Sequence, residues 1–327
     1  MIPLGLIRSR FFTHTPYRLM HVVTSLCNAR CIMCDQWKKS PEQINDLSLE
    51  EIIKMLENAK KAGIFIYTAW GGEPLLRKDL HLILKYAKKL NFITSIITNG
   101  YYLKKRCDEL MPYIDSLVVS IDSNDDLHDK MRGINGIKDK AIEGIKICSK
   151  YKTKITINSV ICKMNVDKID GLVKLSDELS VPINFQPMDV FGEYNEKYRL
   201  TEEDFKKILT KILTYKKAGY NILNSYQYLN IAFKKNHFCC HAPKCIISVD
   251  ANGNIIHFIN ALDKKWGNVK TDSFKDIFNS KEFKQFLKES EKCNKCRYSC
   301  VIEISLAYSL NPRYLIERII SSRFSYL

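Results

Sequence analysis

Residues 19–34 read LMHVVTSLCNARCIMC, an apolar run that is followed at once by three closely spaced cysteines. The apolar part, residues 19–24, predicts a buried strand because it is short, continuous and rich in β-branched residues. Cys27, Cys31 and Cys34 then fall on the loop after that strand. Three thiolates can bind three irons of a cubane cluster and leave the fourth iron without a protein ligand. Such an open position is typical of a catalytic metal site.

A structural zinc site is the alternative interpretation of this triplet. Zinc in a structural site takes four protein ligands, and three cysteines supply only three. The nearest further candidate, His21, falls inside the predicted strand and is poorly placed to reach the loop. The spacing therefore favours an iron–sulfur site.

The chain up to about residue 190 alternates between predicted strands and predicted helices. Six such repeats predict an α/β fold with a parallel sheet covered by helices, whose binding loops lie at the carboxyl ends of the strands. Ser48 and Glu51 form a capping box at the first helix, and Gly63 is a plausible stop for it. The further strands are expected at 64–70, 92–98, 116–121, 155–161 and 182–187, and the helices at 48–61, 79–90, 103–113, 138–151 and 168–179.

Polar and glycine residues follow consecutive strands of this predicted sheet. Each of them could serve simply as a turn or cap residue. Since parallel strands bring their carboxyl ends to one edge, their occurrence at successive strand ends predicts a shared binding site. The residues are Gly71, Gly72 and Glu73 after the second strand, Asn99 after the third, Ser120 and Asp122 after the fourth, and Asn158 in the fifth.

The cysteine triplet and these strand ends resemble the radical S-adenosylmethionine (SAM) superfamily over roughly residues 16–200. The resemblance implies an incomplete (β/α)6, TIM-like barrel. It also implies a [4Fe–4S] cluster held by the three catalytic cysteines, which cleaves SAM reductively to a 5′-deoxyadenosyl radical. That radical would abstract a hydrogen from the substrate.

The same resemblance implies roles for individual residues. The Gly-Gly-Glu segment would hold the amino group of SAM, Ser120 and Asp122 would contact its ribose, and Asn99 and Asn158 would face the site. The family usually has an aromatic residue just before the third cysteine, where this chain has Met33. A methionine also offers a polarizable apolar contact to an adenine ring.

A second group of cysteines follows residue 238. Around a predicted hairpin, residues 246–249 and 254–259, it is similar to the SPASM or twitch extension, which binds an auxiliary cluster. Phe258 stands where that pattern has a cysteine, so Cys245 or Cys300 could supply the missing thiolate, with His257 a more remote candidate. An open iron or a four-thiolate zinc site are the alternatives. The expected ligands of one auxiliary [4Fe–4S] cluster are Cys240, Cys245, Cys293, Cys296 and Cys300.

The chain is expected to divide into four parts. These are an N-terminal segment (1–15), the radical SAM core (16–225), the auxiliary-cluster domain (226–305) and an amphipathic C-terminal helix (306–327). A long helix is expected at 201–218, and two short helices begin near Ser273 and Lys281.

Composition indicates an ordinary folded protein. Of 327 residues 46% are hydrophobic, which is ample for a large core, and no run of about 18 apolar residues could span a membrane. Twelve cysteines, closely spaced in a long chain without a signal peptide, indicate metal ligation in a reducing cytoplasm. The net charge of +15 fits an anionic partner or a lysine-rich solvated surface. No nucleic-acid partner is expected.

The expected partners are SAM, an external electron donor of the flavodoxin or ferredoxin type, and a peptide, lipid or small-metabolite substrate. Cys27 lies so near the N-terminus that no leader-peptide-binding domain is expected before it. Both chain ends mix apolar residues with arginines, so they could dock under the barrel or lie peripherally on the inner membrane surface. The alternative function is a non-catalytic iron–sulfur or zinc protein in electron transfer or binding.

Overall fold

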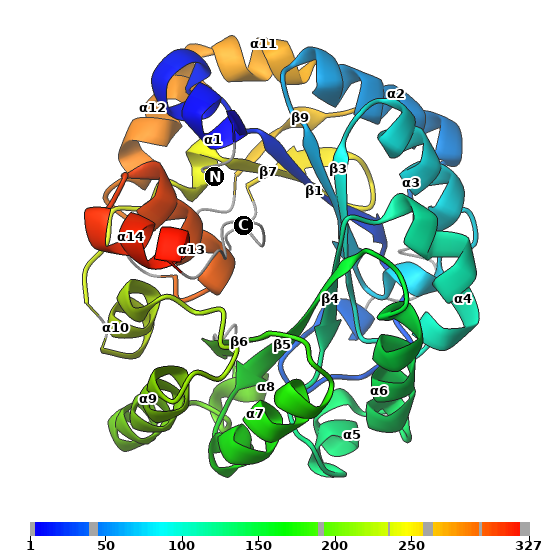
Figure 1. The fold of residues 1–327 in the computed structure, drawn as a ribbon. Helices are drawn as coiled ribbons and strands as arrows, with labels where there is room; N and C mark the ends of the chain where they lie inside the picture. The colour runs from blue at the N-terminus through cyan, green and yellow to red at the C-terminus, as the bar shows by residue number, and fades with distance from the viewer. Residues whose placement is uncertain are drawn as a thin grey trace.

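The computed structural model describes residues 4–38, 45–188, 193–234, 236–257, 264–293 and 296–320. Within them, nine strands form one sheet in the order β6-β5-β4-β3-β2-β1-β7-β8-β9. The sheet curves into an open barrel with helices outside it (Figure 1). The strands are β1 (Arg18–Thr24), β2 (Ile66–Gly71), β3 (Ile93–Thr98), β4 (Ser116–Ser120), β5 (Lys154–Ile161), β6 (Ile183–Pro187), β7 (Ile246–Val249), β8 (Asn254–Ile256) and β9 (Lys265–Asn268).

The helices of the first half cover the outer face of the barrel, and their caps follow the sequence. Ser48 and Glu51 form the expected capping box, and Gly63 ends the first of these helices with a φ of 91°. The helix expected at 103–113 ends at Leu110, because Pro112 cannot donate an amide hydrogen bond and a 3₁₀ turn follows. These helices are α2 (Leu49–Lys61), α3 (Leu80–Lys89), α4 (Leu103–Leu110), α5 (Leu127–Arg132), α6 (Ile137–Cys148) and α7 (Ile169–Glu178), with short turns η2 (Gln36–Lys38), η4 (Pro74–Leu76), η5 (Met111–Tyr113) and η6 (Val166–Lys168).

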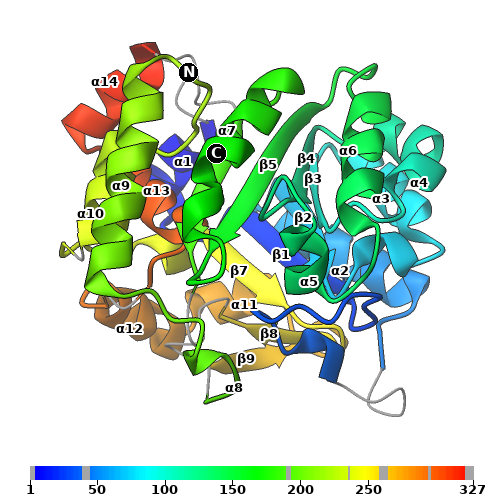
Figure 2. The same ribbon diagram turned by 90° about the horizontal axis from the view of Figure 1, so that it is seen from below.

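The second half adds helices around the remaining side of the barrel (Figure 2). The helix expected at 201–218 is α9, which begins with a capping box between Thr201 and Asp204. The two helices expected near Ser273 and Lys281 are also present. The elements are α8 (Glu193–Glu196), α9 (Glu202–Lys217), α10 (Tyr226–Lys234), η7 (Ala242–Lys244), α11 (Phe274–Asn279), α12 (Lys281–Ser290), α13 (Ser299–Tyr308) and α14 (Pro312–Ile320), and α1 (Leu4–Arg8) with a π-helical turn η1 (Ser9–Thr13) precedes β1.

Burial along β3 to β6 mostly alternates between the two faces of the sheet. The outward side chains are covered by the helices, whereas most inward ones are half-exposed, so much of the barrel interior is accessible to solvent. The buried residues include Ile96, Val119, Ile157 and Phe185, and their half-exposed neighbours include Ser95, Val118, Asn158 and Asn184. An incomplete, TIM-like barrel is therefore confirmed, with an interior that can admit a ligand.

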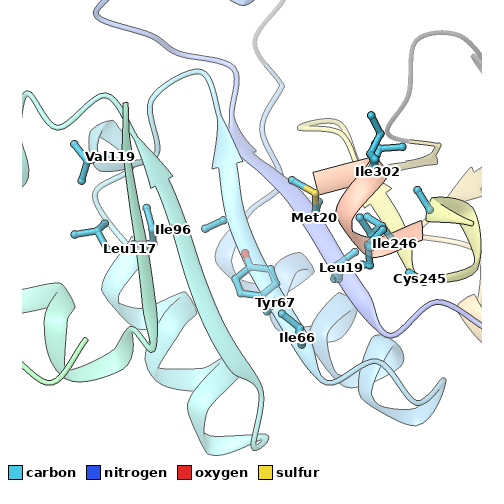
Figure 3. Close-up of a cluster of buried hydrophobic side chains, with 14 of the residues drawn as sticks. Leu19, Met20, Ile66, Tyr67, Ile96, Leu117, Val119, Cys245, Ile246 and Ile302 are labelled. Atoms are coloured by element: carbon cyan, nitrogen blue, oxygen red, sulfur yellow. The ribbon is translucent and has the colours of Figure 1, made fainter. Parts of the chain in front are cut away.

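Helix α13 covers the open side of the barrel. In Figure 3, Met20 of β1 turns toward Ile302 of α13, on the opposite side of the sheet from Leu19. At the far edge, the Asn184 side chain donates a hydrogen bond from Nδ2 to Ser299 Oγ at 2.9 Å. The expected hairpin is present as β7 and β8, but β7 also pairs in parallel with β1, which the sequence did not indicate. The cysteine-rich segment thus continues the barrel sheet.

Candidate functional site

The three N-terminal cysteines lie together on the loop after β1. Cys27, Cys31 and Cys34 belong to one small apolar cluster, which is separate from the main core. The loop is pinned to the end of α5, because the amides of Arg30 and Ile32 donate to carbonyl oxygens at that end, at 2.9 and 3.0 Å. The rest of the cluster includes Ala29, Met33, Met131, Cys162 and Met188, so Met33 faces the same apolar space as the cysteines.

The thiols sit in an environment that suits metal ligation. Burial raises the pKa of the Cys27 thiol to about 12 and also raises the pKa of Cys31. Hydrogen-bond donors oppose this effect: the Ala29 amide lies 3.4 Å from Cys27 Sγ, and Arg132 Nη1 lies 3.9 Å from Cys31 Sγ. Buried thiolates need positive charge nearby, and donors to sulfur help to set the potential of an iron–sulfur cluster. The residues therefore fit a cluster.

Glu73 lies beside this loop at the end of β2. Its carboxylate is almost wholly buried, and it accepts hydrogen bonds from the Leu75 amide, the Thr98 hydroxyl and the Asn99 amide at 3.0, 2.6 and 2.8 Å. Burial raises its pKa, and these three donors oppose the rise. The negative charge of Glu73 in turn helps to raise the pKa of Cys27, so the two groups are neighbours. A carboxylate has about four acceptor positions, so one remains for a cationic ligand.

The two glycines before Glu73 let β2 approach the cysteine loop closely. The Gly72 amide donates to Thr24 O at 2.9 Å, and the Glu73 amide donates to Leu26 O at 2.7 Å. A Cβ on Gly72 would lie 2.1 Å from Leu26 O, and Gly71 has a φ of +134°. Asn99 completes this side of the site, because its Nδ2 donates to Asn28 Oδ1 next to Cys27, at 2.9 Å.

Asp122 is bonded to α5 and β5, and its expected contact with the ribose of SAM stays a prediction. Its carboxylate is fully buried and accepts hydrogen bonds from Arg132 Nε at 2.6 Å and from the Val160 amide at 2.9 Å. The Asp122 amide donates to Nδ1 of the buried His128 at 3.0 Å. Asp122 thus acts on the cysteine loop through Arg132, which also reaches Cys31.

Arg132 and His128 are site residues that the sequence reasoning missed. A signal for them exists, because they stand four residues apart on α5, directly after the strand that ends in Ser120. Residues at this spacing share one helix face, so both side chains point back to the same strand end.

Ser120 and Asn158 are paired neighbours on the inner face of the barrel, in β4 and β5. Asn158 Oδ1 accepts a hydrogen bond from Asn184 Nδ2 of β6 at 2.7 Å. Asn184 also bonds Ser299 Oγ, and Ser299 lies between Cys296 and Cys300 in the sequence. A polar chain therefore runs along the barrel wall from the predicted SAM site toward the second group of cysteines.

The second group of cysteines gathers beside α13. Cys240 and Cys293 are neighbours, since the charge of Cys293 helps, after burial, to raise the pKa of Cys240 to about 12. Cys245 lies in the core, where its thiol hydrogen-bonds the Tyr17 hydroxyl. Cys296 belongs to the same apolar core, and the partly buried Cys300 packs against it.

Two further positions bear on this second site. Phe258 lies outside the described residues. His257 is buried, its pKa is lowered to about 4 by burial, and its Nε2 has no hydrogen-bond partner among the described residues. A neutral imidazole with a free nitrogen is a suitable metal ligand. Among the described residues, no three His, Cys, Asp or Glu side chains converge as ligands of a single metal ion do, whereas a cluster spreads its ligands over several irons.

Comparison with known proteins agrees with both groups of cysteines. Residues 21–176 match the sequence model of the radical SAM superfamily, and residues 239–300 match that of SPASM, an iron–sulfur cluster-binding domain. The AdoMet-dependent heme synthase of Methanosarcina barkeri is 23% identical over 93% of this chain and 96% of its own length. The GTP 3′,8-cyclase of Clostridium acetobutylicum is 32% identical over 57% of this chain and 61% of its own length.

A solved structure shares the fold. The crystal structure of Streptococcus suis SuiB bound to S-adenosylmethionine superposes with a TM-score of 0.69 at 20% identity, over 86% of this chain and 70% of that one. The two sequence matches fall on the two groups of cysteines described above, and the fold match extends over the barrel that carries them. The chain therefore belongs to the radical SAM superfamily and carries a SPASM domain, so it is an enzyme that uses SAM and iron–sulfur clusters.

Proposed function

We propose that the chain removes a hydrogen atom from its substrate, using a cluster on Cys27, Cys31 and Cys34. When bound there, the [4Fe–4S] cluster and SAM supply a 5′-deoxyadenosyl radical. The proposal rests on three grouped thiols, one buried and two half-buried, that lie next to Glu73 and Asn99 at one end of an open barrel.

The proposed SAM contacts follow the strand ends. Gly71, Gly72 and Glu73 would hold the amino group, with the last free acceptor position of Glu73 directed to it. Met33 would contact the adenine, and Ser120, Asn99 and Asn158 would line the rest of the site. Ser120 and Asp122 would contact the ribose, and Asp122 would also hold Arg132 against the cysteine loop.

The second group of cysteines would hold an auxiliary [4Fe–4S] cluster. Its proposed ligands are drawn from Cys240, Cys245, Cys293, Cys296 and Cys300. We propose that the radical SAM core spans residues 16–225 and that the auxiliary-cluster domain spans residues 226–305. Helix α13 contains Cys300 in its first turn and covers the open side of the barrel, which supports electron exchange between this cluster and a substrate bound inside.

The substrate class is open to direct test. The heme synthase relative matches nearly its whole length, which supports an iron tetrapyrrole as the first compound to try. A peptide or a lipid is the alternative. We further propose a cytoplasmic position with an external flavodoxin- or ferredoxin-type donor and peripheral contact with the membrane. No helix among the described residues is long and apolar enough to cross a bilayer.

The test is anaerobic incubation of the reconstituted enzyme with SAM and a strong reductant, followed by measurement of 5′-deoxyadenosine. Cys31→Ala should lose the product, whereas Cys239→Ala, at an exposed cysteine outside the proposed ligand set, should retain it. Iron and sulfide counts should fall by about one four-iron cluster in Cys31→Ala and in Cys240→Ala. Absence of 5′-deoxyadenosine from a fully loaded wild-type enzyme would overturn the proposal.

A further inference from the structure

The exposed apolar side chains of this protein are concentrated at its two ends. Eleven large hydrophobic residues are exposed among the described side chains, and six of them fall within residues 7–12 and 316–320. Soluble monomers rarely expose contiguous apolar patches, and such patches mark contact surfaces. The six are Ile7, Phe11, Phe12, Ile316, Ile319 and Ile320.

Helix α14 is fixed with its apolar side outward. Its inner side is anchored by Tyr314, which is fully buried, and by Arg318, whose Nη2 lies 2.6 Å from the buried carboxylate of Glu303. Ile316 and Ile319 point the other way and are 57% and 65% exposed. The sequence left open whether this helix docks on the barrel. It does dock, but the buried ion pair prevents the isoleucines from turning inward.

The N-terminal segment is held on the neighbouring part of the surface. Phe11 and Phe12 in η1 are 55% and 78% exposed. The segment is tied to the end of α13, because the Arg10 guanidinium lies 5.3 Å from the Tyr308 ring centre and His14 Nδ1 lies 3.5 Å from its hydroxyl. Helix α14 begins just after Tyr308, and both views show α1 and α14 beside α13 (Figures 1 and 2).

The charge around these residues is strongly positive. Arg8, Arg10 and Arg313 lie in these two segments with exposed or half-exposed side chains, whereas Arg318 is neutralised by Glu303, and the one acidic residue within 4–15 and 312–320 is Glu317. Glu317 is itself paired with Lys216, whose Nζ lies 3.0 Å from Oε1. Each basic side chain near an anionic bilayer contributes about 1 kcal/mol of attraction. Exposed apolar side chains that share these segments with exposed arginines therefore complement the interface of an anionic membrane better than they complement water.

We propose that these two segments form a membrane-docking surface, which inserts Phe11, Phe12, Ile316, Ile319 and Ile320 into the interface of an anionic bilayer. In Figure 2 this surface lies at the opposite end of the barrel from α5, which holds the cysteine loop. The active site would therefore stay open to its electron donor and substrate while the enzyme is bound to lipid.

The test is flotation of the full-length reconstituted enzyme with phosphatidylcholine vesicles, with and without phosphatidylglycerol. The wild type should float with the anionic vesicles only, and added salt should weaken the binding. Ile316→Glu/Ile319→Glu and Phe11→Ser/Phe12→Ser should each reduce the bound fraction roughly tenfold. Leu82→Glu, at a helical position that is 42% exposed elsewhere, is the matched control and should bind as the wild type does.

Formation of 5′-deoxyadenosine keeps this test separate from the proposed reaction. The double variants should form it at the wild-type rate, which shows that they are folded. Equal flotation of wild type and both variants, or no flotation of the wild type, would overturn the docking surface. A wild-type dimer that becomes monomeric in the variants, without any binding to vesicles, would assign the surface to a second copy and overturn the proposal as well.

Discussion

Arg132 and Asp122 form a buried ion pair, with Nε 2.6 Å from Oδ2, and the same guanidinium extends to Cys31 Sγ. The pair joins the helix after β4 to the loop after β1. Because Asp122 also accepts the Val160 amide, three strand ends are fixed relative to one another. The position of Cys31 is therefore set by residues that need not touch the cluster.

Asp122→Asn should destabilise the folded protein by about 3–5 kcal/mol, because it leaves the Arg132 charge buried without its partner. It should also lower the iron content, since Arg132 would no longer be oriented toward Cys31. Urea unfolding and iron analysis measure the two effects. Asp126→Asn, at a side chain that is 91% exposed, is the control and should change neither. A stable, fully loaded Asp122→Asn protein would contradict this role.

Glu73→Gln should weaken SAM binding by at least roughly tenfold while the cluster still assembles. The amide has the same shape, but it removes the negative charge that attracts an ammonium group. Changes in the electron paramagnetic resonance spectrum of the reduced cluster on SAM titration measure the affinity. Glu50→Gln, at an exposed i,i+4 pair on α2, is the control. If Glu73→Gln retains wild-type affinity, the carboxylate serves only to join β2 to β3.

Gly72→Ala should prevent the end of β2 from approaching the cysteine loop. The added Cβ would lie 2.1 Å from Leu26 O, a backbone atom that cannot move without shifting the loop. Cluster content should therefore fall sharply, as measured by iron analysis. Gly136→Ala is the comparison, because its Cβ meets nothing within 4 Å and only its φ of +72° is strained, at a cost of about 1 kcal/mol. Equal cluster content in the two variants would refute the steric argument.

The sequence predicted the elements of the barrel well because each rests on local chemistry. The six strands begin and end within two residues of the predicted runs, and Ser48 caps the first helix as its spacing indicated. Short runs rich in β-branched and apolar residues, separated by amphipathic helical stretches, are a strong local signal for strands. The meeting of the cysteine loop with Glu73 and Asn99 followed from topology, since parallel strand ends share one edge.

Features that depend on long-range packing were not predictable. The parallel pairing of β7 with β1 joins segments far apart in the chain, and nothing in residues 246–249 distinguishes it from an ordinary hairpin strand. Similarly, Cys107 and Cys148 are separated by 41 positions, yet their sulfur atoms lie 2.8 Å apart between α4 and α6. The pairing of Asp122 with Arg132 was missed because a carboxylate at a strand end can face a ligand or a neighbouring helix equally well.

The buried His128 leads to a final prediction, which concerns the pH dependence of the free energy of unfolding. Burial lowers its pKa to about 4; the charges of Arg132 and Lys138 add to this effect, whereas those of Asp122 and Asp129 oppose it. His128 Nδ1 accepts a hydrogen bond from the Asp122 amide. A proton on Nδ1 would therefore point at the amide hydrogen of Asp122, which adds to the cost of protonation. In the unfolded chain the group titrates near its ordinary value of 6.5.

Since the folded pKa is the lower one, the stabilising contribution of neutral His128 is complete above pH 6.5 and is lost as the pH falls toward 4. Between pH 7 and pH 5 the wild type should lose about 2 kcal/mol more of its free energy of unfolding than His128→Gln does. Urea midpoints at the two pH values measure the difference. His237→Gln, at an exposed position, should lose as much as the wild type. A pH dependence that is the same in wild type and His128→Gln would show that His128 can take up its proton without unfolding.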